Sequence, residues 1–129
     1  MFGHPAGDTF AHFEANALER VCRIAHGEIP SKKVYEDSDV FAFYDINPQA
    51  PTHVIVIPRK HISSLDDLSD GEANVVGITL VRLAQIARDL HLSSDGYRVV
   101  ANHGEAAGQT VFHIHFHLLG GRNFGWPPG

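Results

Sequence analysis

The sequence contains a single cysteine, Cys22, and few basic residues. One cysteine excludes an internal disulfide and a cysteine-rich zinc site, and it favours a reducing compartment. Ten Lys and Arg residues stand against fifteen Asp and Glu, and the formal charge of −5 argues against a general nucleic-acid-binding protein. No hydrophobic run approaches the length of a membrane span, and residues 1–7 lack the basic start and apolar core of a secretory signal. We therefore expect a cytoplasmic protein that binds neither nucleic acid nor membranes.

The length and hydrophobic content are those of one globular domain. The chain has 129 residues, of which 43% are hydrophobic, enough to bury a core without disulfides or metals. Gly3, Pro5 and Gly7 lie close together near the start of the chain. We therefore expect residues 1–8 to form a flexible tail and residues 9–129 to form a single domain.

Hydrophobic spacing predicts two helices and five strands. Apolar residues recur at helical spacing over residues 8–26, and residues 69–72 have the spacing of a capping box that opens a helix to about Leu90. The apolar positions of this second helix predict a buried stripe, which consists of Val76, Leu80, Leu83, Ala87 and Leu90. Alternating patterns between turns predict strands at residues 34–36, 40–44, 52–58, 97–102 and around 112–118. This order favours an α+β domain with an antiparallel sheet.

Three of the ten histidines occur within five residues, at His113, His115 and His117. They alternate strictly with apolar residues, which is the period of a β-strand. A strand here would place the three imidazoles in a row on one face. The residues predicted to face the core are Phe112, Ile114, Phe116 and Leu118. A small-residue loop, residues 103–109, precedes the segment, and the combination indicates a functional site.

One interpretation of the histidines is a zinc site. Histidines two apart on a strand can both reach one ion, and three nitrogen ligands with an open position form a catalytic zinc centre. However, the first and last of three such residues lie about 13 Å apart on an extended strand. A further ligand would then come from elsewhere, and the candidates are His53, His61 and His103.

A second interpretation is nucleophilic catalysis by an imidazole. A neutral histidine nitrogen can attack phosphorus and divide a difficult displacement into two easier steps. The attacking ring needs a partner on its other nitrogen to hold one tautomer, and the developing charge needs hydrogen-bond donors. Neighbouring histidines and the loop at 108–110, with its backbone N–H groups, amide and hydroxyl, contain these groups. The residues fit phosphoryl chemistry better than a metal site, while a purely structural polar face is the least favoured interpretation.

The motif His-Ile-His-Phe-His-Leu-Leu at 113–119 resembles the signature of the histidine triad (HIT) nucleotide-binding family. The resemblance extends from about residue 21 to residue 129. It includes Gly-Glu-Ile-Pro at 27–30, Ala-Phe-Tyr-Asp-Ile at 42–46, Pro-Gln-Ala-Pro-Thr-His at 48–53 and Gly-Gly-Arg at 120–122. The closing Trp-Pro-Pro-Gly at 126–129 is similar to the Hint branch of that family, the purine nucleoside phosphoramidases.

The resemblance implies a fold, an assembly and an activity. The implied fold is a five-stranded antiparallel sheet with a long helix and an N-terminal helix, and the sheet continues across a homodimer. The implied substrates are AMP- or GMP-like purine nucleotide derivatives, cleaved at the α-phosphorus. The reaction would release an amine or acid, leave a nucleotidyl-histidine and end with hydrolysis to the nucleoside monophosphate.

The resemblance also implies roles for individual residues. His115 matches the nucleophile, His117 matches its phosphate-contacting and proton-handling partner, and His113 and His53 match a supporting pair. Asp45 matches the acid that binds the ribose hydroxyls. The implied phosphate contacts are Asn102, Gly108, Gln109 and Thr110; the implied base slot consists of Ile24, Phe43, Ile46 and Ile55. Trp126 matches a C-terminal residue that reaches the neighbouring subunit's site.

Two features narrow the expectation further. Cys22 lacks the second cysteine found in zinc-containing members of the family, so neither a structural metal nor any other cofactor is expected. The alternatives are a dinucleoside polyphosphate hydrolase, as in another branch of the family, and a non-catalytic nucleotide-sensing module. The tail at 126–129 argues against the first, and nothing in the sequence excludes the second.

Overall fold

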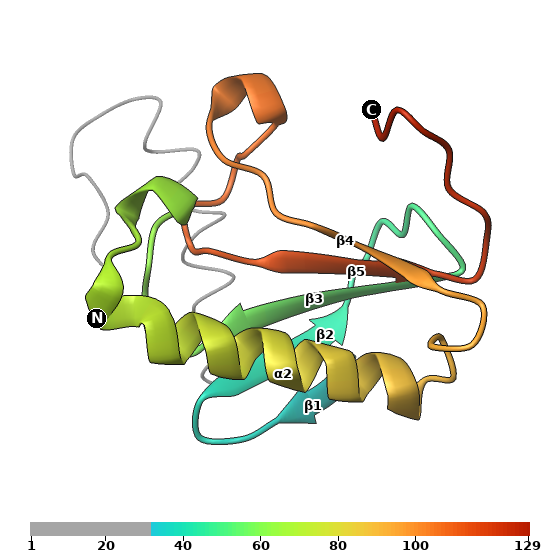
Figure 1. The fold of residues 1–129 in the computed structure, drawn as a ribbon, viewed down its shortest axis with the longest axis horizontal. Helices are drawn as coiled ribbons and strands as arrows, with labels where there is room; N and C mark the ends of the chain where they lie inside the picture. Colours follow the sequence, from blue (N-terminus) through green and yellow to red (C-terminus); the bar gives the residue numbers. More distant parts are fainter. Residues whose placement is uncertain (1–31) are drawn as a thin grey trace.

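The computed structural model describes residues 32–129, which form an antiparallel sheet with one main helix on it (Figure 1). The sheet order is β1-β2-β3-β5-β4, and every neighbouring pair is antiparallel. The strands are β1 (Lys33–Glu36), β2 (Val40–Tyr44), β3 (Thr52–Pro58), β4 (Tyr97–Val100) and β5 (Phe116–Gly120). The helices are α2 (Ala73–Asp89) and the short 3-10 turns η1 (Leu65–Asp67), η2 (Asp70–Glu72) and η3 (Glu105–Ala107). The predicted α+β class and antiparallel sheet are confirmed. The predicted helix at 8–26 lies outside the described residues.

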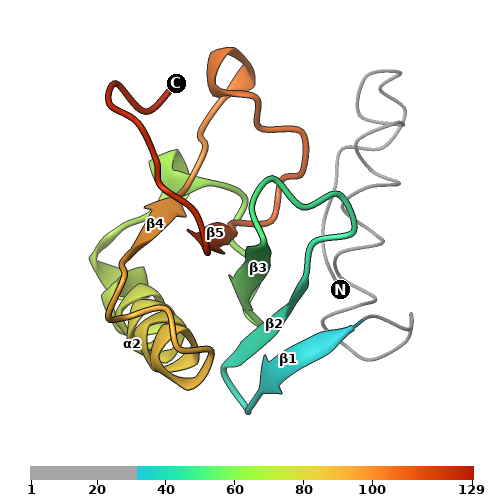
Figure 2. The same ribbon diagram turned by 90° about the vertical axis from the view of Figure 1, so that its right-hand side faces the viewer.

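Helix α2 covers one face of the sheet, as Figure 2 shows. Val54 and Val56 of β3 point toward α2 and are fully buried against Leu83 and Ala87. The alternate residues of β3 point to the opposite face, where Ile55 and Ile57 join a second buried cluster with Phe41 and Phe43. Burial of each such side chain contributes about 1.5–3 kcal/mol. Alternate side chains of β3 are therefore buried on opposite faces of the sheet.

The capping box at the start of the long helix is present. The Glu72 carboxylate accepts hydrogen bonds from the backbone N–H and the hydroxyl of Ser69, at 2.9 and 2.8 Å. It closes η2, which leads directly into α2. The predicted buried stripe is confirmed at Leu83 and Ala87 but wrong at Leu80, which is 40% exposed; the helix buries Ile86 instead.

The predicted strand of histidines is wrong in its first half. β5 begins only at Phe116, so His117 is the one member of the triad that lies in it. The backbone N–H of Ile114 donates to the Ile62 carbonyl at 2.6 Å, which turns the preceding segment away from the sheet ladder. His113 is consequently buried at 0% exposure, and the three rings do not form a row on one face.

The β1–β2 turn is closed by the carboxylate of Asp37. It accepts hydrogen bonds from the Tyr35 hydroxyl at 2.7 Å and from Arg82 Nε of α2 at 2.8 Å. The backbone N–H groups of Asp39 and Val40 donate to it as well. These bonds join the turn to the helix, and they hold the pKa of Asp37 well below its ordinary value although burial alone would raise it. Within residues 32–129, no helix is long and apolar enough to cross a bilayer.

Candidate active site

Strand pairing brings His53 and His117 together on the face of the sheet opposite α2. His117 is paired with Ile55, and His53 is paired with Leu119 two positions along the ladder, so both rings project to the same side. The Nε2 atom of His53 lies 2.9 Å from the Nδ1 atom of His117, and the ring centroids are 5.1 Å apart. Positions 64 residues apart in the chain thus form one hydrogen-bonded pair.

The partners of His53 determine the tautomers of both rings. The backbone N–H of Gln49 lies 3.0 Å from His53 Nδ1, and because an N–H group only donates, Nδ1 must accept. Neutral His53 therefore carries its proton on Nε2 and donates it to His117 Nδ1. His117 therefore carries its own proton on Nε2, and this N–H is free of the bond to His53 and can donate to another group.

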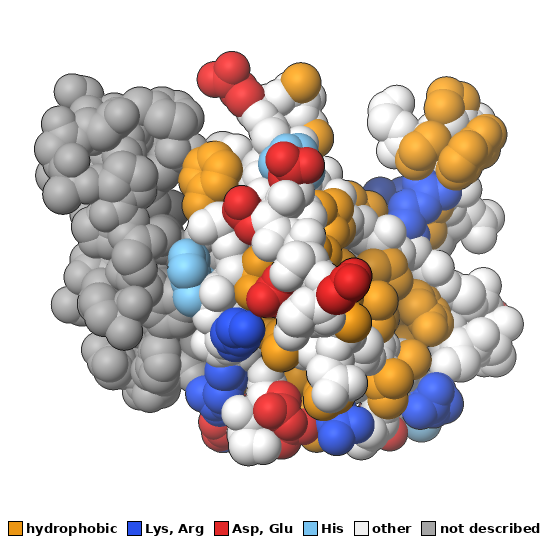
Figure 3. Space-filling view, turned by 60° about the vertical axis from the view of Figure 1, so that its left-hand side comes forward, with side chains coloured by type: hydrophobic (Ala, Val, Ile, Leu, Met, Phe, Trp, Pro, Cys, Tyr) orange, Lys and Arg blue, Asp and Glu red, His pale blue; other side chains and the backbone are white. Residues whose placement is uncertain are grey.

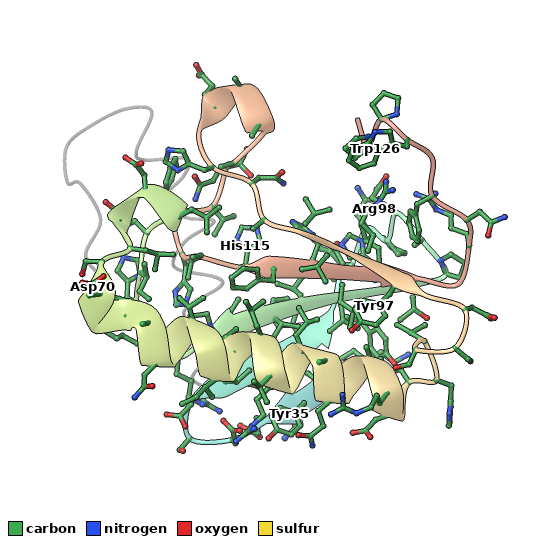
Figure 4. The ribbon with its side chains drawn as sticks, in the orientation of Figure 1. Tyr35, Asp70, Tyr97, Arg98, His115 and Trp126 are labelled. Carbon is green, nitrogen blue, oxygen red and sulfur yellow. The ribbon has the colours of Figure 1, made fainter. Side chains whose placement is uncertain are left out.

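His115 is held in the opposite sense. Its Nδ1 atom lies 2.8 Å from the carbonyl oxygen of His113, and a carbonyl oxygen only accepts. Nδ1 of His115 therefore carries the proton, and Nε2 keeps its lone pair. The His115 ring, labelled in Figure 4, is half-buried just before β5. It meets the His117 ring edge-on, with centroids 5.1 Å apart. A lone pair and an N–H donor thus stand on adjacent rings.

His113 supports this arrangement through its backbone. Its buried ring lies with Nε2 2.8 Å from the Pro58 carbonyl and packs edge-on against His61. The ring anchors the chain at the end of β3, and this fixes the carbonyl that orients His115. The predicted support of the site by His113 and His53 thus involves separate contacts, one to His115 and one to His117.

Burial keeps the paired histidines neutral. Desolvation, together with the nearby His115 and His53, lowers the pKa of His117 to about 4, while Asp45 opposes the shift. Desolvation also lowers the pKa of His53, again against the attraction of Asp45. Both rings are therefore uncharged at neutral pH, the state in which the hydrogen-bond chain just described exists.

Asp45 lies beside this pair at the end of β2. One carboxylate oxygen is 3.4 Å from His53 Nε2, and the other accepts the backbone N–H of Asn47 at 2.8 Å. Within residues 32–129, Asp45, His53 and His117 are the cluster whose ligand atoms all lie within 4.8 Å of one another. A metal there would need the Nε2 lone pair of His53, whereas the Gln49 N–H keeps a proton on that nitrogen. The donor set therefore fits a hydrogen-bonded acid better than a resident metal.

The loop before the histidines is closed largely on itself. Gly104 and Gly108 flank η3 at φ 83° and 85°, values that L-side chains rarely adopt. The N–H groups of Gly108 and Gln109 donate to the carbonyls of Glu105 and Gly104. The buried Gln109 amide accepts from Gly104 N–H at 2.9 Å and donates to the Ser63 and Val111 carbonyls. Thr110 is exposed at the end of this loop.

The remaining predicted site residues are dispersed. Phe43 and Ile55 are cross-strand partners in the buried cluster beside His117. Ile46 is 93% exposed and lies outside that cluster. Trp126 is 85% exposed on the C-terminal tail, apart from His115 in Figure 4. Asn102 is half-buried after β4, and Ile24 lies outside the described residues.

This geometry can be compared with known proteins. A family model for the HIT domain matches residues 26–124. The chain belongs to the HIT domain family. A HIT family hydrolase from Legionella pneumophila has a TM-score of 0.83 and 49% identity, covering 84% of this chain and 97% of that one. The purine nucleoside phosphoramidase of Escherichia coli is 45% identical over 103 residues, 80% of this chain and 87% of that protein. A maize 14 kDa zinc-binding protein is 47% identical over 109 residues, 83% and 84% of the two chains.

Two residues of this HIT site are not apparent from the sequence pattern. Gln49 contributes a backbone N–H to His53, and Pro58 contributes a carbonyl to His113. Backbone groups are present at every position, so residue type carries no signal of their use. The proline-bounded loop at 48–51 was the only available indication.

Proposed function

We propose that this HIT protein is a nucleotide hydrolase that cleaves nucleoside 5′-monophosphate derivatives, phosphoramidates or acyl-nucleotides, at the α-phosphorus. The observation that carries the proposal is the pairing of opposite tautomers, a lone pair on His115 Nε2 beside a proton on His117 Nε2. A nucleophile and a hydrogen-bond donor on adjacent rings are what such a two-step displacement uses. The similarity to a purine nucleoside phosphoramidase supports the proposal.

In the first step, the lone pair of His115 Nε2 attacks the α-phosphorus and forms a P–N bond. The bond from phosphorus to the substrate's amine breaks; the leaving nitrogen accepts a hydrogen bond from His117 Nε2–H and takes its proton from solvent. The His115 ring then carries positive charge, which the His113 carbonyl stabilises through its hydrogen bond to Nδ1. The products of this step are the free amine and a nucleotidyl-histidine.

In the second step, water attacks the same phosphorus and releases one proton to solvent. The P–N bond to His115 breaks and its electron pair returns to Nε2, so the His115 ring regains its starting state. The second product is the nucleoside monophosphate. His53 keeps its proton on Nε2 throughout, because the Gln49 N–H occupies its other nitrogen.

Nucleotide recognition is assigned to the residues around this centre. Asp45 accepts hydrogen bonds from the ribose hydroxyls, and exposed Thr110 contacts the phosphate together with Asn102. Phe43 and Ile55 form the apolar floor on which a purine lies. The AMP- or GMP-like specificity rests on the family relationship rather than on a base contact.

The proposed enzyme is a homodimer that extends the sheet through β4. β4 is an edge strand, and it exposes Tyr97 and Val99. On α2, Leu80 and Val81 are 40% and 58% exposed. An apolar edge strand and helix surface favour pairing with a second copy. Trp126 on the exposed tail would then reach the neighbour's site. Sedimentation velocity of wild type and Val81→Glu tests this: a monomeric wild type contradicts it.

Turnover of adenosine 5′-phosphoramidate tests the activity. We expect His115→Ala to abolish turnover, and rapid quenching of the wild type to trap a nucleotide on the peptide that contains His115. The matched control is His91→Asn, an exposed histidine at φ 62°, a conformation that asparagine tolerates. Wild-type turnover by His115→Ala would refute the assignment. Preference for diadenosine polyphosphates would favour the other enzyme branch, and tight AMP binding without turnover of either substrate would favour a sensing module.

A further inference from the structure

Gln49 is held from both sides by residues of the site and of the C-terminal tail. Its N–H donates to His53 Nδ1 at 3.0 Å. Its carbonyl oxygen accepts two hydrogen bonds from Arg122, from Nε at 3.2 Å and from a terminal nitrogen at 3.1 Å. A single residue of the 45–51 loop therefore joins the tail to the paired histidines.

The position of Gln49 decides which tautomer His53 adopts. If the Gln49 N–H moved away, His53 could carry its proton on Nδ1, because no donor would face that nitrogen. Nε2 of His53 would then present a lone pair to Nδ1 of His117, and the His117 proton would be drawn to Nδ1. His117 would lose the Nε2–H that faces the leaving group. The contact at Gln49 thus controls the proton on a ring two hydrogen bonds away.

Arg122 is itself positioned by the tail. Its guanidinium lies 4.2 Å from the centroid of the Phe124 ring, and a terminal nitrogen donates to the Asn123 carbonyl at 3.0 Å. Arg98 of β4 lies 5.2 Å from the same ring and donates to the Gly125 carbonyl at 2.9 Å. In Figure 3 hydrophobic side chains stand beside basic ones at the upper right, where Figure 1 places the C-terminal tail. Stacking reduces the number of orientations open to an otherwise exposed guanidinium.

We infer that Arg122 is a positioning residue for the His53–His117 pair and acts through Gln49. The role of that pair in hydrogen bonding to the leaving group rests on the proposed function, whereas the hydrogen-bond path does not. If the role of Arg122 were only structural, it would be to attach the tail to the sheet. Arg98 also contacts the tail, so it serves as the comparison. Both arginines contact Phe124, but only Arg122 bonds to Gln49.

The test is nitrogen-15 NMR of the histidine rings in the full chain, without substrate, with signals assigned by single histidine substitutions. We expect wild-type His53 to show a protonated Nε2 and an unprotonated Nδ1. Arg122→Ala should shift both nitrogens toward the average of the two tautomers and change the His117 signals with them. Arg122→Lys, which restores a single donor, should recover part of the wild-type spectrum. Arg98→Ala should leave the His53 and His117 signals as they are in the wild type.

Kinetics add a second readout if phosphoramidate turnover is found. We expect Arg122→Ala to lower kcat on the order of tenfold with a smaller change in KM, because the hydrogen-bond donor to the leaving group is disturbed and the binding site is not. Wild-type histidine spectra in folded Arg122→Ala, or equal changes in Arg98→Ala, would overturn the inference. Should Arg122→Ala fail to fold, Arg122→Gln and Arg122→Lys decide by the same spectra. A wild type without turnover would defeat the proposed function and leave the spectral test intact.

Discussion

His53 donates its Nε2–H to His117 Nδ1 across 2.9 Å, from a ring that is only 4% exposed. Each ring has one nitrogen committed to this bond, and the remaining nitrogen of His53 accepts from Gln49. The two histidines therefore act as a unit in which one ring sets the proton position of the other. The proposed mechanism depends on this relationship more than on the charge of either ring.

The first prediction concerns the removal of this support. We expect His53→Ala to lower kcat on adenosine phosphoramidate by about 10–100-fold, because His117 keeps its place but loses the partner that fixes its Nε2–H. KM should change less, since His53 is buried behind the ring that meets the substrate. Steady-state kinetics across pH 5–9 measure both quantities, with His91→Asn as the control. An unchanged kcat would show that His117 needs no orienting partner.

The second prediction concerns stability between about pH 6.5 and pH 4. The pKa of His117 falls from an ordinary 6.5 to about 4 in the folded protein, so the unfolded chain binds a proton that the native state refuses. The contribution is fully present above about pH 6.5 and is lost as the pH falls toward 4. A shift of this size corresponds to a loss on the order of 3 kcal/mol over this range. Urea unfolding of wild type and His117→Gln measures it; the variant should show the smaller pH dependence, and equal slopes would contradict the prediction.

The strands and the long helix followed from local pattern. β2 and β3 have the predicted boundaries, and the capping box at Ser69 and Glu72 is formed. Alternation failed at His113 because its surroundings are set by the Pro58 and Ile62 carbonyls, more than fifty residues earlier in the chain. A period of two describes a strand's faces only where the strand is paired, and pairing is a long-range property.

The sequence indicates candidate residues for the site but not the positions of their protons. The resemblance grouped His53 with His113 as a supporting pair, whereas the structure joins His53 to His117. The backbone groups that set the tautomers, Gln49 N–H and His113 C=O, leave no trace in residue type. The exposure of Ile46 could not be inferred from the sequence either. An apolar residue in a loop can line a pocket or lie on the surface, and the residue type does not distinguish the two. The base-slot role of Ile46 stays a prediction.

The third prediction concerns Asp37. We expect Asp37→Ala to lower the free energy of unfolding by about 2–3 kcal/mol, because Tyr35, Arg82 and two backbone N–H groups lose one charged acceptor. Because folding lowers the pKa of Asp37, the carboxylate stabilises the fold at pH values above its ordinary pKa of 3.8. This stabilisation is lost as the pH falls below that value. Guanidinium unfolding at pH 7 measures the effect against Asp39→Ala, an exposed neighbour expected to cost under about 0.5 kcal/mol. Equal losses in the two variants would show that the Asp37 network is not stabilising.

The fourth prediction concerns Gln109, whose amide braces the loop before the histidines. Gln109→Glu keeps the shape but turns an oxygen toward the carbonyls of Ser63 and Val111, where two N–H groups now donate. We expect a loss of about 1–3 kcal/mol in unfolding free energy and a KM for the phosphoramidate raised on the order of tenfold. Urea unfolding and steady-state kinetics measure these changes. The control is Glu105→Gln, an exposed residue of the same loop. A raised KM without loss of stability would indicate a direct phosphate contact instead of a brace.

The fifth prediction concerns Gly121, at the junction between β5 and the tail. Its φ of +92° is unfavourable for an L-residue, and a Cβ would lie 2.9 Å from Cβ of Pro51. The Pro51 ring cannot rotate away, so Gly121→Ala must displace the 45–51 loop or the tail. We expect it to cost about 1–3 kcal/mol of stability. Because Asp45 and Gln49 lie on that loop, the histidine NMR signals should change in the same variant.

Gly125→Ala provides the matched control for this change. A Cβ at Gly125 would meet no atom within 4 Å, although the residue lies in the same tail only four positions on. Calorimetric melting of the two variants separates a general effect of adding a methyl group from the specific contact with Pro51. We expect Gly125→Ala to melt as the wild type does and to keep the wild-type His53 spectrum. If Gly121→Ala also did so, the junction would tolerate a side chain, and the close packing of the tail on the 45–51 loop would have no part in holding Gln49.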